Sequence, residues 1–214
     1  MRIINPSIEV LDVLDQEKIL KRLELVGRTC YKSEDKITDF SCVSFIQKII
    51  KSGHHAIIEH YDISVKVICD RGVSHEIVRH RIASYAQEST RFCNYASGKF
   101  GSEITVIEPC FWRISDSILD TKMIIWNQAM EQCQKAYNNL ISLGATPQEA
   151  RSVLPNSLKT EIIMTMNLRE WRHFLTLRTS KAAHPQMKEV ANMILAEFKS
   201  KLPVIFEDIS LSMR

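Results

Sequence analysis

The chain has 214 residues and a formal net charge of +3, and 45% of its residues are hydrophobic and 25% charged. This length suits one domain with a proper hydrophobic core, and we expect residues 1–214 to form a single domain. The small net charge argues against a nucleic-acid-binding protein, and no apolar run is long enough to span a bilayer.

The six cysteines are scattered along the chain without any Cys-x-x-Cys pair. This spacing argues against a zinc ribbon and against a disulfide scaffold, and it predicts free thiols. The N-terminal residues lack the charged-then-apolar order and the cleavage site of a signal peptide. We therefore expect a cytoplasmic protein with reduced cysteines.

Hydrophobic periodicity divides the chain into strands and helices. Strands are predicted where apolar and polar residues alternate, over residues 3–13 (with a break at Pro6), 62–69, 106–114 and 160–168. Helices are predicted where apolar residues recur at helical spacing, over residues 16–26, 40–51, 71–80, 121–143, 147–153, 169–177 and 186–202. The elements do not alternate regularly, so the predicted class is α+β, with a mixed sheet flanked by helices.

Boundary residues support several of these elements. Gly27 is expected to end the first helix, and Gly144 the long one. Asp70 is expected to cap the helix that begins at Arg71, because its carboxylate can accept hydrogen bonds from the first-turn amides. The polar residues that follow that helix, as far as Lys99, predict a loop or a short hairpin.

A basic stretch follows this capped helix and runs from Arg79 to Arg91. It reads Arg-His-Arg-Ile-Ala-Ser-Tyr-Ala-Gln-Glu-Ser-Thr-Arg. Arginine matches phosphate or carboxylate in two-point contacts, and the hydroxyls of Ser89 and Thr90 add donors. A run of charges is usually a solvated face, but apolar residues interrupt this one and it leads into Phe92 and Tyr95. The stretch therefore predicts an anion-binding site.

The C-terminal half carries a second basic set, which begins with Arg151 in the short helix. Arg169, Arg172 and His173 have the i, i+3, i+4 spacing that places them on one helix face. Arg178 lies nine residues after Arg169, half a turn from a whole number of turns, and is expected to point elsewhere. A helix that faces two ligand groups would have this pattern, although a solvated face fits it equally well.

Other catalytic motifs are absent from the sequence. His75-Glu76…His80 and His55…Glu59-His60 each miss the spacing of a helical zinc motif by one residue, so we expect no metal. Ser89 lacks the Gly-x-Ser-x-Gly turn of a serine nucleophile and is better placed as a hydrogen-bond donor. Neither a dinucleotide-binding glycine motif nor a P-loop is present, so phosphates would have to bind to side chains.

Several ordered motifs together resemble flavin-dependent thymidylate synthases, from about residue 27 to the C-terminus. The family hallmark of Arg-His-Arg, seven residues and then Ser is present as Arg79-His80-Arg81 and Ser89. The remaining matches are Gly53-His54 with Glu59-His60, the segment 149–155, Asn167-Leu168-Arg169, Leu177-Arg178 and His184.

This resemblance implies an activity, cofactors and an assembly. Such enzymes convert dUMP to dTMP, with 5,10-methylenetetrahydrofolate as the carbon donor. Reduced FAD supplies the hydride, and NADPH reduces the flavin. The resemblance also implies a homotetramer with active sites at subunit interfaces, and neither nucleic acid nor membrane as a partner. The chain has more arginines in these motifs than one small ligand needs, and two ligands, a dinucleotide cofactor and a nucleotide monophosphate, would account for their number.

The resemblance also implies roles for individual residues. Arg178 would stabilise negative charge on the pyrimidine. The residues expected to contact FAD are Ala56, Arg79, His80, Arg81, Gln87, Asn167, Leu168, Arg169 and His173. The residues expected to contact dUMP are Glu76, Ile77, Val78, Arg79, Gln87, Glu88, Ser89, Thr90, Arg91, Arg151 and Arg178.

The chain departs from the family pattern at a few positions, and two other functions stay open. Ala86 stands where the family often has Asn, Phe92 where it has Tyr, and Glu76 where some members have Gln. The arginines could instead serve a nucleic-acid-binding module that uses Phe92, Tyr95 and Trp171 as stacking platforms. A flavoprotein without thymidylate chemistry is the third possibility.

Overall fold

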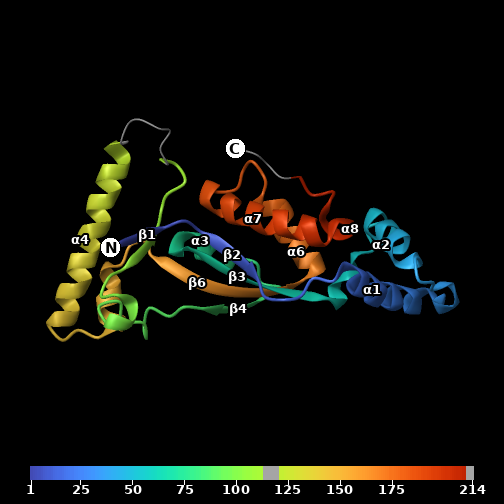
Figure 1. The fold of residues 1–214 in the computed structure, drawn as a ribbon, viewed down its shortest axis with the longest axis horizontal. Coiled ribbons are helices and arrows are strands. Elements are labelled where there is room, and N and C mark those ends of the chain that lie inside the picture. Colours follow the sequence, from blue (N-terminus) through green and yellow to red (C-terminus); the bar gives the residue numbers. More distant parts are fainter. Residues whose placement is uncertain (113–120, 211–214) are drawn as a thin grey trace. The chain divides into compact units, whose positions relative to one another are not determined.

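The computed structural model describes residues 1–112 and 121–210. The chain divides into two compact units. Figure 1 shows the helices and strands, coloured from the N-terminus to the C-terminus. Unit 1 comprises Met1–Ser7, Val67–Arg79 and Ala86–Ile162, and unit 2 comprises Ile8–Lys66, His80–Tyr85 and Ile163–Arg214. The expected single domain stays a prediction. No helix within the described residues is both long enough and apolar enough to cross a membrane.

Two sheets confirm the predicted mixture of helices and strands. The larger sheet has the strand order β2-β3-β6-β4. Its strands are β2 (Ser7–Val10), β3 (Asp62–Asp70), β6 (Lys159–Asn167) and β4 (Ser84–Gln87). The smaller sheet pairs β1 (Arg2–Ile4) with β5 (Thr105–Ile107) in parallel, with Ile3 opposite Val106. The α+β class is therefore correct.

One predicted strand feature is confirmed and two differ from the structure. The break at Pro6 is confirmed, and the two pieces on either side of it join different sheets. The strand expected over residues 106–114 ends at Ile107, and its last two residues lie outside the described part of the chain. The stretch expected as a loop or hairpin contains β4, whose four residues are too polar and too few to give a clear alternating pattern.

Unit 2 is built from helices that pack around aromatic side chains. Its helices are α1 (Gln16–Tyr31), α2 (Ser41–Lys51), α6 (Leu168–Arg178), α7 (Pro185–Lys201) and α8 (Pro203–Phe206), with 3₁₀ turns η1 (Glu34–Lys36) and η2 (His55–His60). Trp171 is fully buried and meets Phe174 and Phe198 edge to face, at centroid distances of 5.6 and 5.0 Å. Its Nε1 donates to the Ile63 carbonyl at 3.0 Å, which ties α6 to β3.

Gly27 corrects one predicted boundary, because α1 continues through it to Tyr31. The helix ends instead at Lys32, which adopts a left-handed conformation with φ of 48°. A Cβ atom at position 27 would lie 2.5 Å from Cε1 of Phe45, on α2. The glycine is therefore explained by the close approach of the Phe45 side chain to α1 and not by helix termination.

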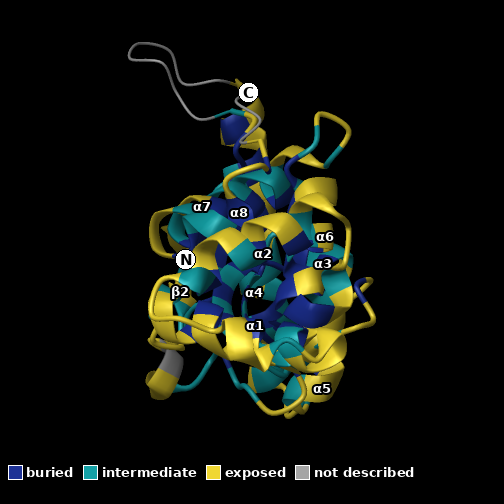
Figure 2. Cartoon of the chain, turned by 90° about the vertical axis from the view of Figure 1, so that its right-hand side faces the viewer, coloured by how far each residue is buried: buried dark blue, intermediate teal, exposed yellow. Residues whose placement is uncertain are grey.

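Unit 1 packs its longest helix against short strands and turns. Its helices are α3 (Arg71–Ile77), α4 (Thr121–Ser142) and α5 (Pro147–Ala150), with 3₁₀ turns η3 (Gly98–Phe100) and η4 (Arg151–Val153). Its core contains Tyr95, Val106, Trp126 and Tyr137 among other buried residues. Figure 2 colours the backbone cartoon by how far each residue is buried.

The helix boundaries of unit 1 follow from local hydrogen bonds. The side chain of Asp70 accepts from the amide of Val73 at 2.8 Å, so the predicted cap of α3 is confirmed. That helix ends at Ile77, three residues earlier than predicted. Thr146 and Glu149 form a capping box at the start of α5.

Candidate functional site

The two predicted ligand sets divide between the two units. All the predicted dUMP residues except Arg178 lie in unit 1. All the predicted FAD residues except Arg79 and Gln87 lie in unit 2. Unit 2 thus carries most of the proposed cofactor site together with the proposed catalytic arginine, and unit 1 carries the nucleotide segment. The two groups are described separately.

A cavity of about 440 Å³ opens in unit 2 where β6 passes into α6. Three predicted FAD residues, Asn167, Arg169 and His173, help to line it. The side chain of Asn167 caps α6 by accepting from the amide of Glu170 at 2.9 Å. Nη1 of Arg169 lies 2.5 Å from Oε1 of Glu59, so this exposed guanidinium is held by a surface ion pair. These three residues therefore lie around one cavity, and their contact with FAD stays a prediction.

His80 contacts two residues of α6, and both of its ring nitrogens take part in hydrogen bonds. Its imidazole is 5% exposed and packs edge to face on Phe174. Its Nδ1 lies 3.2 Å from Oε1 of Glu170, and its Nε2 lies 3.1 Å from Nε of Arg178. The ring therefore connects two residues of α6, and its nitrogens face protein groups.

The protonation state of His80 follows from these contacts. The Nε of Arg178 carries a hydrogen and can only donate, so Nε2 of His80 must offer a lone pair. The proton of the neutral ring then sits on Nδ1 and is donated to Glu170. Burial lowers the pKa of His80 below its usual 6.5, the hydrogen bond to Glu170 opposes this, and the positive charge of Arg178 lowers the pKa further. The imidazole is therefore neutral at pH 7.

His80, Glu170 and His173 also form a group that could hold a metal ion. Their ligand atoms lie within 4.8 Å of one another, and this grouping comes from the described residues alone. A cation at Nε2 of His80 would compete with the guanidinium of Arg178, which is itself positive. The contacts therefore favour a hydrogen-bonded chain over a metal centre, and the expected absence of a metal stays a prediction.

The predicted ligand-facing surface of α6 needs one correction. Arg172 was expected to share it with Arg169 and His173, but its side chain instead pairs with Asp208. Its Nη1 and Nη2 lie 2.7 and 2.6 Å from the two carboxylate oxygens of Asp208, and Nη1 also donates to the Ile205 carbonyl. Arg172 therefore fastens α6 to the segment that follows α8.

Two further predicted contacts are limited to the backbone. The side chains of Ile77 and Leu168 are fully buried in the hydrophobic core. A ligand contact at either position would have to use an amide or a carbonyl group. Val78, Arg79, Arg81 and Ala56 are exposed, as a ligand-binding role requires.

In unit 1 the predicted nucleotide segment lies after β4. Arg91 and Arg151 are exposed, whereas Thr90 is buried. Nη1 of Arg151 lies 3.5 Å from Oγ1 of Thr90, which is a weak contact. The Ser89 hydroxyl accepts from the amide of Arg91 at 3.3 Å. The segment therefore presents guanidinium groups that have few strong protein partners.

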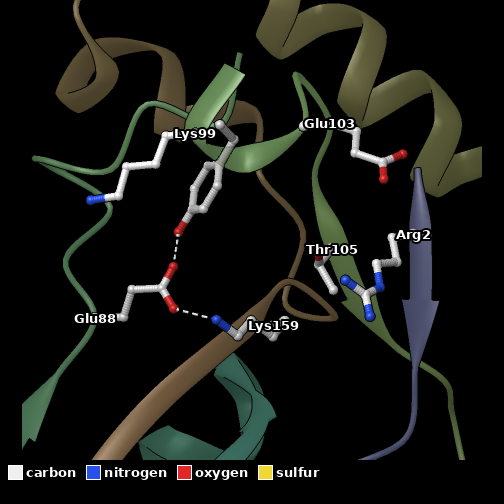
Figure 3. A pocket seen from close by; sticks show the side chains of 8 residues that line it. Arg2, Glu88, Lys99, Glu103, Thr105 and Lys159 are labelled. Carbon is white, nitrogen blue, oxygen red and sulfur yellow. Dashed lines mark hydrogen bonds and ion pairs between the residues drawn. The ribbon is translucent and has the colours of Figure 1, made fainter. Parts of the chain in front are cut away.

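Glu88 lines a polar cavity of about 330 Å³. One carboxylate oxygen accepts from the Tyr95 hydroxyl at 2.8 Å and the other lies 2.8 Å from Nζ of Lys159 (Figure 3). The backbone amide of Glu88 donates to the Glu161 carbonyl at 2.9 Å. The side chain predicted to contact dUMP is thus occupied by protein groups.

Gln87 is anchored beside it. Its Nε2 donates to Oγ of Ser74 at 2.9 Å and to Oγ1 of Thr160 at 3.1 Å. The anchoring partners Lys159 and Thr160 were not singled out from the sequence, and Tyr95 was named only as a possible stacking platform. Lys159 and Thr160 lie far from Glu88 and Gln87 along the chain, and the pairing of β4 with β6 brings them together.

Ionisation of this anchor supports its hydrogen bonds. Burial raises the pKa of the Tyr95 hydroxyl, and the neighbouring carboxylate of Glu88 raises it further, so the phenol stays a donor. Burial opposes the charge of Lys159, but hydrogen bonds to Glu161 and Glu88 outweigh it and raise the pKa of the ammonium. Glu88 is therefore paired with a charged lysine and a protonated tyrosine at neutral pH.

Comparisons with known proteins match nearly the whole chain. The family model described as thymidylate synthase complementing protein matches residues 11–204. A flavin-dependent thymidylate synthase from Geobacter sulfurreducens is 33% identical, over 86% of this chain and 79% of the relative. One from Pyrococcus furiosus is 32% identical, over 82% of this chain and 70% of the relative.

A solved structure has the same fold. The UMP/dUMP methylase PolB from Streptomyces cacaoi, bound with 5-Br dUMP, superposes with a TM-score of 0.77 at 22% identity. The match covers 97% of this chain and 96% of that one. The family model and the two relatives, which together span the segments that carry both arginine sets, lead to one conclusion: this chain belongs to the thymidylate synthase complementing protein family, whose relatives named above are flavin-dependent thymidylate synthases.

Proposed function

We propose that this chain is an FAD-dependent thymidylate synthase that reductively methylates dUMP to dTMP. 5,10-Methylenetetrahydrofolate supplies the carbon and becomes tetrahydrofolate, and NADPH supplies the reducing equivalents. The observation that carries the proposal is the match to flavin-dependent thymidylate synthases over most of the chain. The two arginine-bearing sites described above agree with the two phosphate-bearing ligands that this reaction needs.

The residues of unit 2 fit an anionic flavin cofactor. Arg81 and Arg169 are exposed cations, and Arg169 lies with Asn167 and His173 around the cavity at the start of α6. Guanidinium groups of this kind match a diphosphate in two-point contacts. Bound FAD supplies the hydride for the reduction of the transferred carbon. We assign the predicted FAD residues of unit 2 to this site, with Leu168 acting through its backbone.

The residues of unit 1 fit a nucleotide monophosphate. Arg91 and Arg151 supply two charged forks, and the Ser89 hydroxyl supplies a neutral donor. Charge-assisted hydrogen bonds to phosphate are stronger than neutral ones, so these arginines would provide most of the binding energy for dUMP. Glu88 supports this segment through Tyr95 and Lys159, and any contact it makes with the nucleotide would come from its backbone.

Arg178 is the proposed catalytic residue. Addition at the uracil ring develops negative charge on the pyrimidine, and a guanidinium that is already oriented stabilises that charge better than water does. The neutral imidazole of His80 supports this role, because it accepts a hydrogen bond from Arg178 without adding a competing positive charge. Arg178 is therefore held in place before the reaction and would stabilise negative charge that develops on the pyrimidine only during it.

We also infer that the enzyme is a homotetramer whose active sites are shared between subunits. The support is the family resemblance, which implies a homotetramer with active sites shared between subunits. Light scattering on the purified protein tests the assembly, and a monomeric, active enzyme would contradict it. A cytoplasmic location stays an expectation.

The decisive experiment measures tritium release from dUMP labelled at uracil C5. The purified protein is given 5,10-methylenetetrahydrofolate and NADPH, with and without added FAD. Folate-dependent release with dTMP formed only in the presence of reductant would establish the reaction. A folded, flavin-loaded protein that releases no tritium would instead be a flavoprotein of another kind. Salt-sensitive binding to polynucleotides, without saturable dUMP binding, would indicate a nucleic-acid-binding module.

A further inference from the structure

We propose that Glu170 and His80 are positioning residues for Arg178. In this arrangement Glu170 holds the His80 ring in the Nδ1–H tautomer, and the ring in turn orients the guanidinium through its Nε2 lone pair. The inference rests on the proposed function, because it assumes that Arg178 acts on the pyrimidine. It adds a residue, Glu170, to which the sequence motifs and the family match give no role.

The geometry of the three residues carries the inference. Oε1 of Glu170 lies 3.2 Å from Nδ1 of His80, and Nε of Arg178 lies 3.1 Å from Nε2. His80 is 5% exposed and Glu170 8%, so water competes little for either contact. All three belong to unit 2, and both hydrogen bonds are therefore internal to one compact part of the chain.

The order of donors along this chain has one solution. A guanidinium donates and never accepts, so the hydrogen on Nε of Arg178 fixes Nε2 of His80 as an acceptor. A neutral imidazole with an acceptor at Nε2 carries its hydrogen on Nδ1. A carboxylate accepts that hydrogen, so Glu170 and Arg178 together stabilise this tautomer. Carboxylates that hold a functional histidine by its second nitrogen have the same effect in other proteins.

The position of the three residues on the fold explains why a relay is needed. Glu170 lies in the first turn of α6 and Arg178 in its last, eight residues and about 12 Å further along the helix axis. Their side chains belong to one helix but are not neighbours at i, i+4 spacing. The His80 ring, which enters from the segment after α3, bridges the two. Phe174 packs on the ring edge to face at 4.8 Å and restricts its rotation.

Removal of the carboxylate has a specific expected consequence. Without Glu170, the hydrogen bond from Arg178 alone favours the Nδ1–H tautomer, and the Nδ1 hydrogen has lost its acceptor. The Nε2–H form then becomes more populated, and in that form two donors would face each other at Arg178. The guanidinium would then lose its fixed plane while keeping its charge. The expected defect is therefore in turnover rather than in binding of the flavin or the nucleotide.

The test compares Glu170→Ala and Glu170→Gln with the wild-type enzyme. Carboxylates that hold metal-binding histidines by the second nitrogen typically contribute 10- to 100-fold, and by analogy kcat for dTMP formation is expected to fall by about 10-fold or more in Glu170→Ala. Because Glu170 also lines the cavity assigned to FAD, kcat is compared at saturating FAD and dUMP, where a loss of positioning still shows and a loss of binding does not. Glu170→Gln keeps an acceptor oxygen, should retain most of the activity, and keeps the test usable if the alanine variant folds poorly.

A double-mutant cycle separates positioning from a merely structural role. Arg178→Lys keeps a positive charge but lacks the Nε–H donor. If Glu170 acts through Arg178, adding Glu170→Ala to Arg178→Lys should change kcat by less than about twofold. An equal loss of kcat in both backgrounds would overturn the inference. The matched control is Glu24→Ala, which also removes a buried carboxylate paired with an arginine in unit 2 and should lower stability without this coupling.

A spectroscopic measurement keeps the inference testable if the proposed function fails. Long-range ¹⁵N–¹H correlations of the His80 ring report its tautomer whether or not the enzyme makes dTMP. The Nδ1–H form is expected in the wild-type protein and a mixture in Glu170→Ala. An Nε2–H tautomer in the wild-type protein would contradict the proposed positioning directly. A wild-type protein with the expected tautomer but no dTMP formation would refute the proposed function and confine the relay to a structural role.

Discussion

The two units hold their arginines in different ways. In unit 2, Arg178 donates to a buried, neutral imidazole that a carboxylate in turn holds. In unit 1, Arg91 and Arg151 are exposed, and the contact of Arg151 with Thr90 spans 3.5 Å. The difference corresponds to two tasks. A charge that stabilises a transition state gains from being fixed beforehand, whereas a charge that binds phosphate can stay solvated until the ligand arrives.

The strongest test of this comparison is Arg178→Ala. Removal of a preorganised charge typically lowers kcat by about 100- to 1,000-fold, so dTMP formation should fall by that factor while FAD stays bound. Tritium release from labelled dUMP and the flavin absorbance measure the two quantities. Turnover near the wild-type value would break the assignment of Arg178 as the catalytic residue.

Arg151→Ala should show the opposite kinetic pattern. A charge-assisted hydrogen bond contributes about 1.5–3 kcal/mol, so the dissociation constant for dUMP should rise by roughly 10-fold or more. Because the contact is present before and during the reaction, kcat at saturating dUMP should change little. Steady-state kinetics over a range of dUMP concentrations separates the two effects. A fall in kcat equal to that of Arg178→Ala would erase the distinction between the units.

The anchor of the nucleotide segment gives a smaller effect. Lys159→Ala leaves the half-buried Glu88 carboxylate with Tyr95 as its remaining side-chain partner among those described above, so the segment that carries Ser89 and Arg91 should loosen. We expect dUMP binding to weaken by about 3- to 10-fold with FAD content unchanged, in line with lost hydrogen bonds to a charged group. Glu103→Ala is the matched control, because Glu103 lines the same cavity but pairs with the N-terminal ammonium. Equal effects of the two variants would contradict an anchoring role.

The stability of unit 2 should depend on pH through His80. Its folded-state pKa is lowered, so the unfolded state binds a proton first as the pH falls. The contribution is complete above about pH 6.5 and is lost as the pH drops below that value towards the folded-state pKa. The free energy of unfolding should decrease by up to about 1 kcal/mol per pH unit there, and His80→Gln should remove that slope. A slope that persists in His80→Gln would assign it to another group.

The smallest effect is expected at the capping box of α5. Thr146→Ala removes a side chain that bonds Glu149 at 2.6 Å, and loss of such a cap costs about 1 kcal/mol. Chemical denaturation measures this change, and Gln148→Ala, at an exposed neighbouring position, is the control. Because α5 leads directly to Arg151, a parallel loss of dUMP affinity would link this cap to the nucleotide site.

Local signals predicted most of the fold, and long-range pairing explains what they missed. The alternating pattern and the cap at Asp70 placed β3 and the start of α3 correctly, since both depend on neighbouring residues. The strand β4 was missed because its identity comes from its pairing with β6. The arginines of the site were found from their chemistry and motifs. The supporting roles of Glu170 and Lys159 were not predicted, and Tyr95 was named only as a possible stacking platform. No local sequence pattern shows that a carboxylate, a phenol or an ammonium supports a neighbouring site residue.

The glycine at position 27 has a consequence for engineering. Replacing a mid-helix glycine by alanine usually stabilises a helix by about 1 kcal/mol, which makes Gly27 in α1 an obvious position to substitute. Here the added methyl group would meet the ring of Phe45, over which the guanidinium of Arg28 lies at 4.4 Å from the ring centroid. Phe45 and Arg28 both line a cavity of about 580 Å³, so the substitution would reshape its wall. Any stabilisation of α1 by Gly27→Ala would therefore require Phe45 to move, and this movement would change the shape of the cavity.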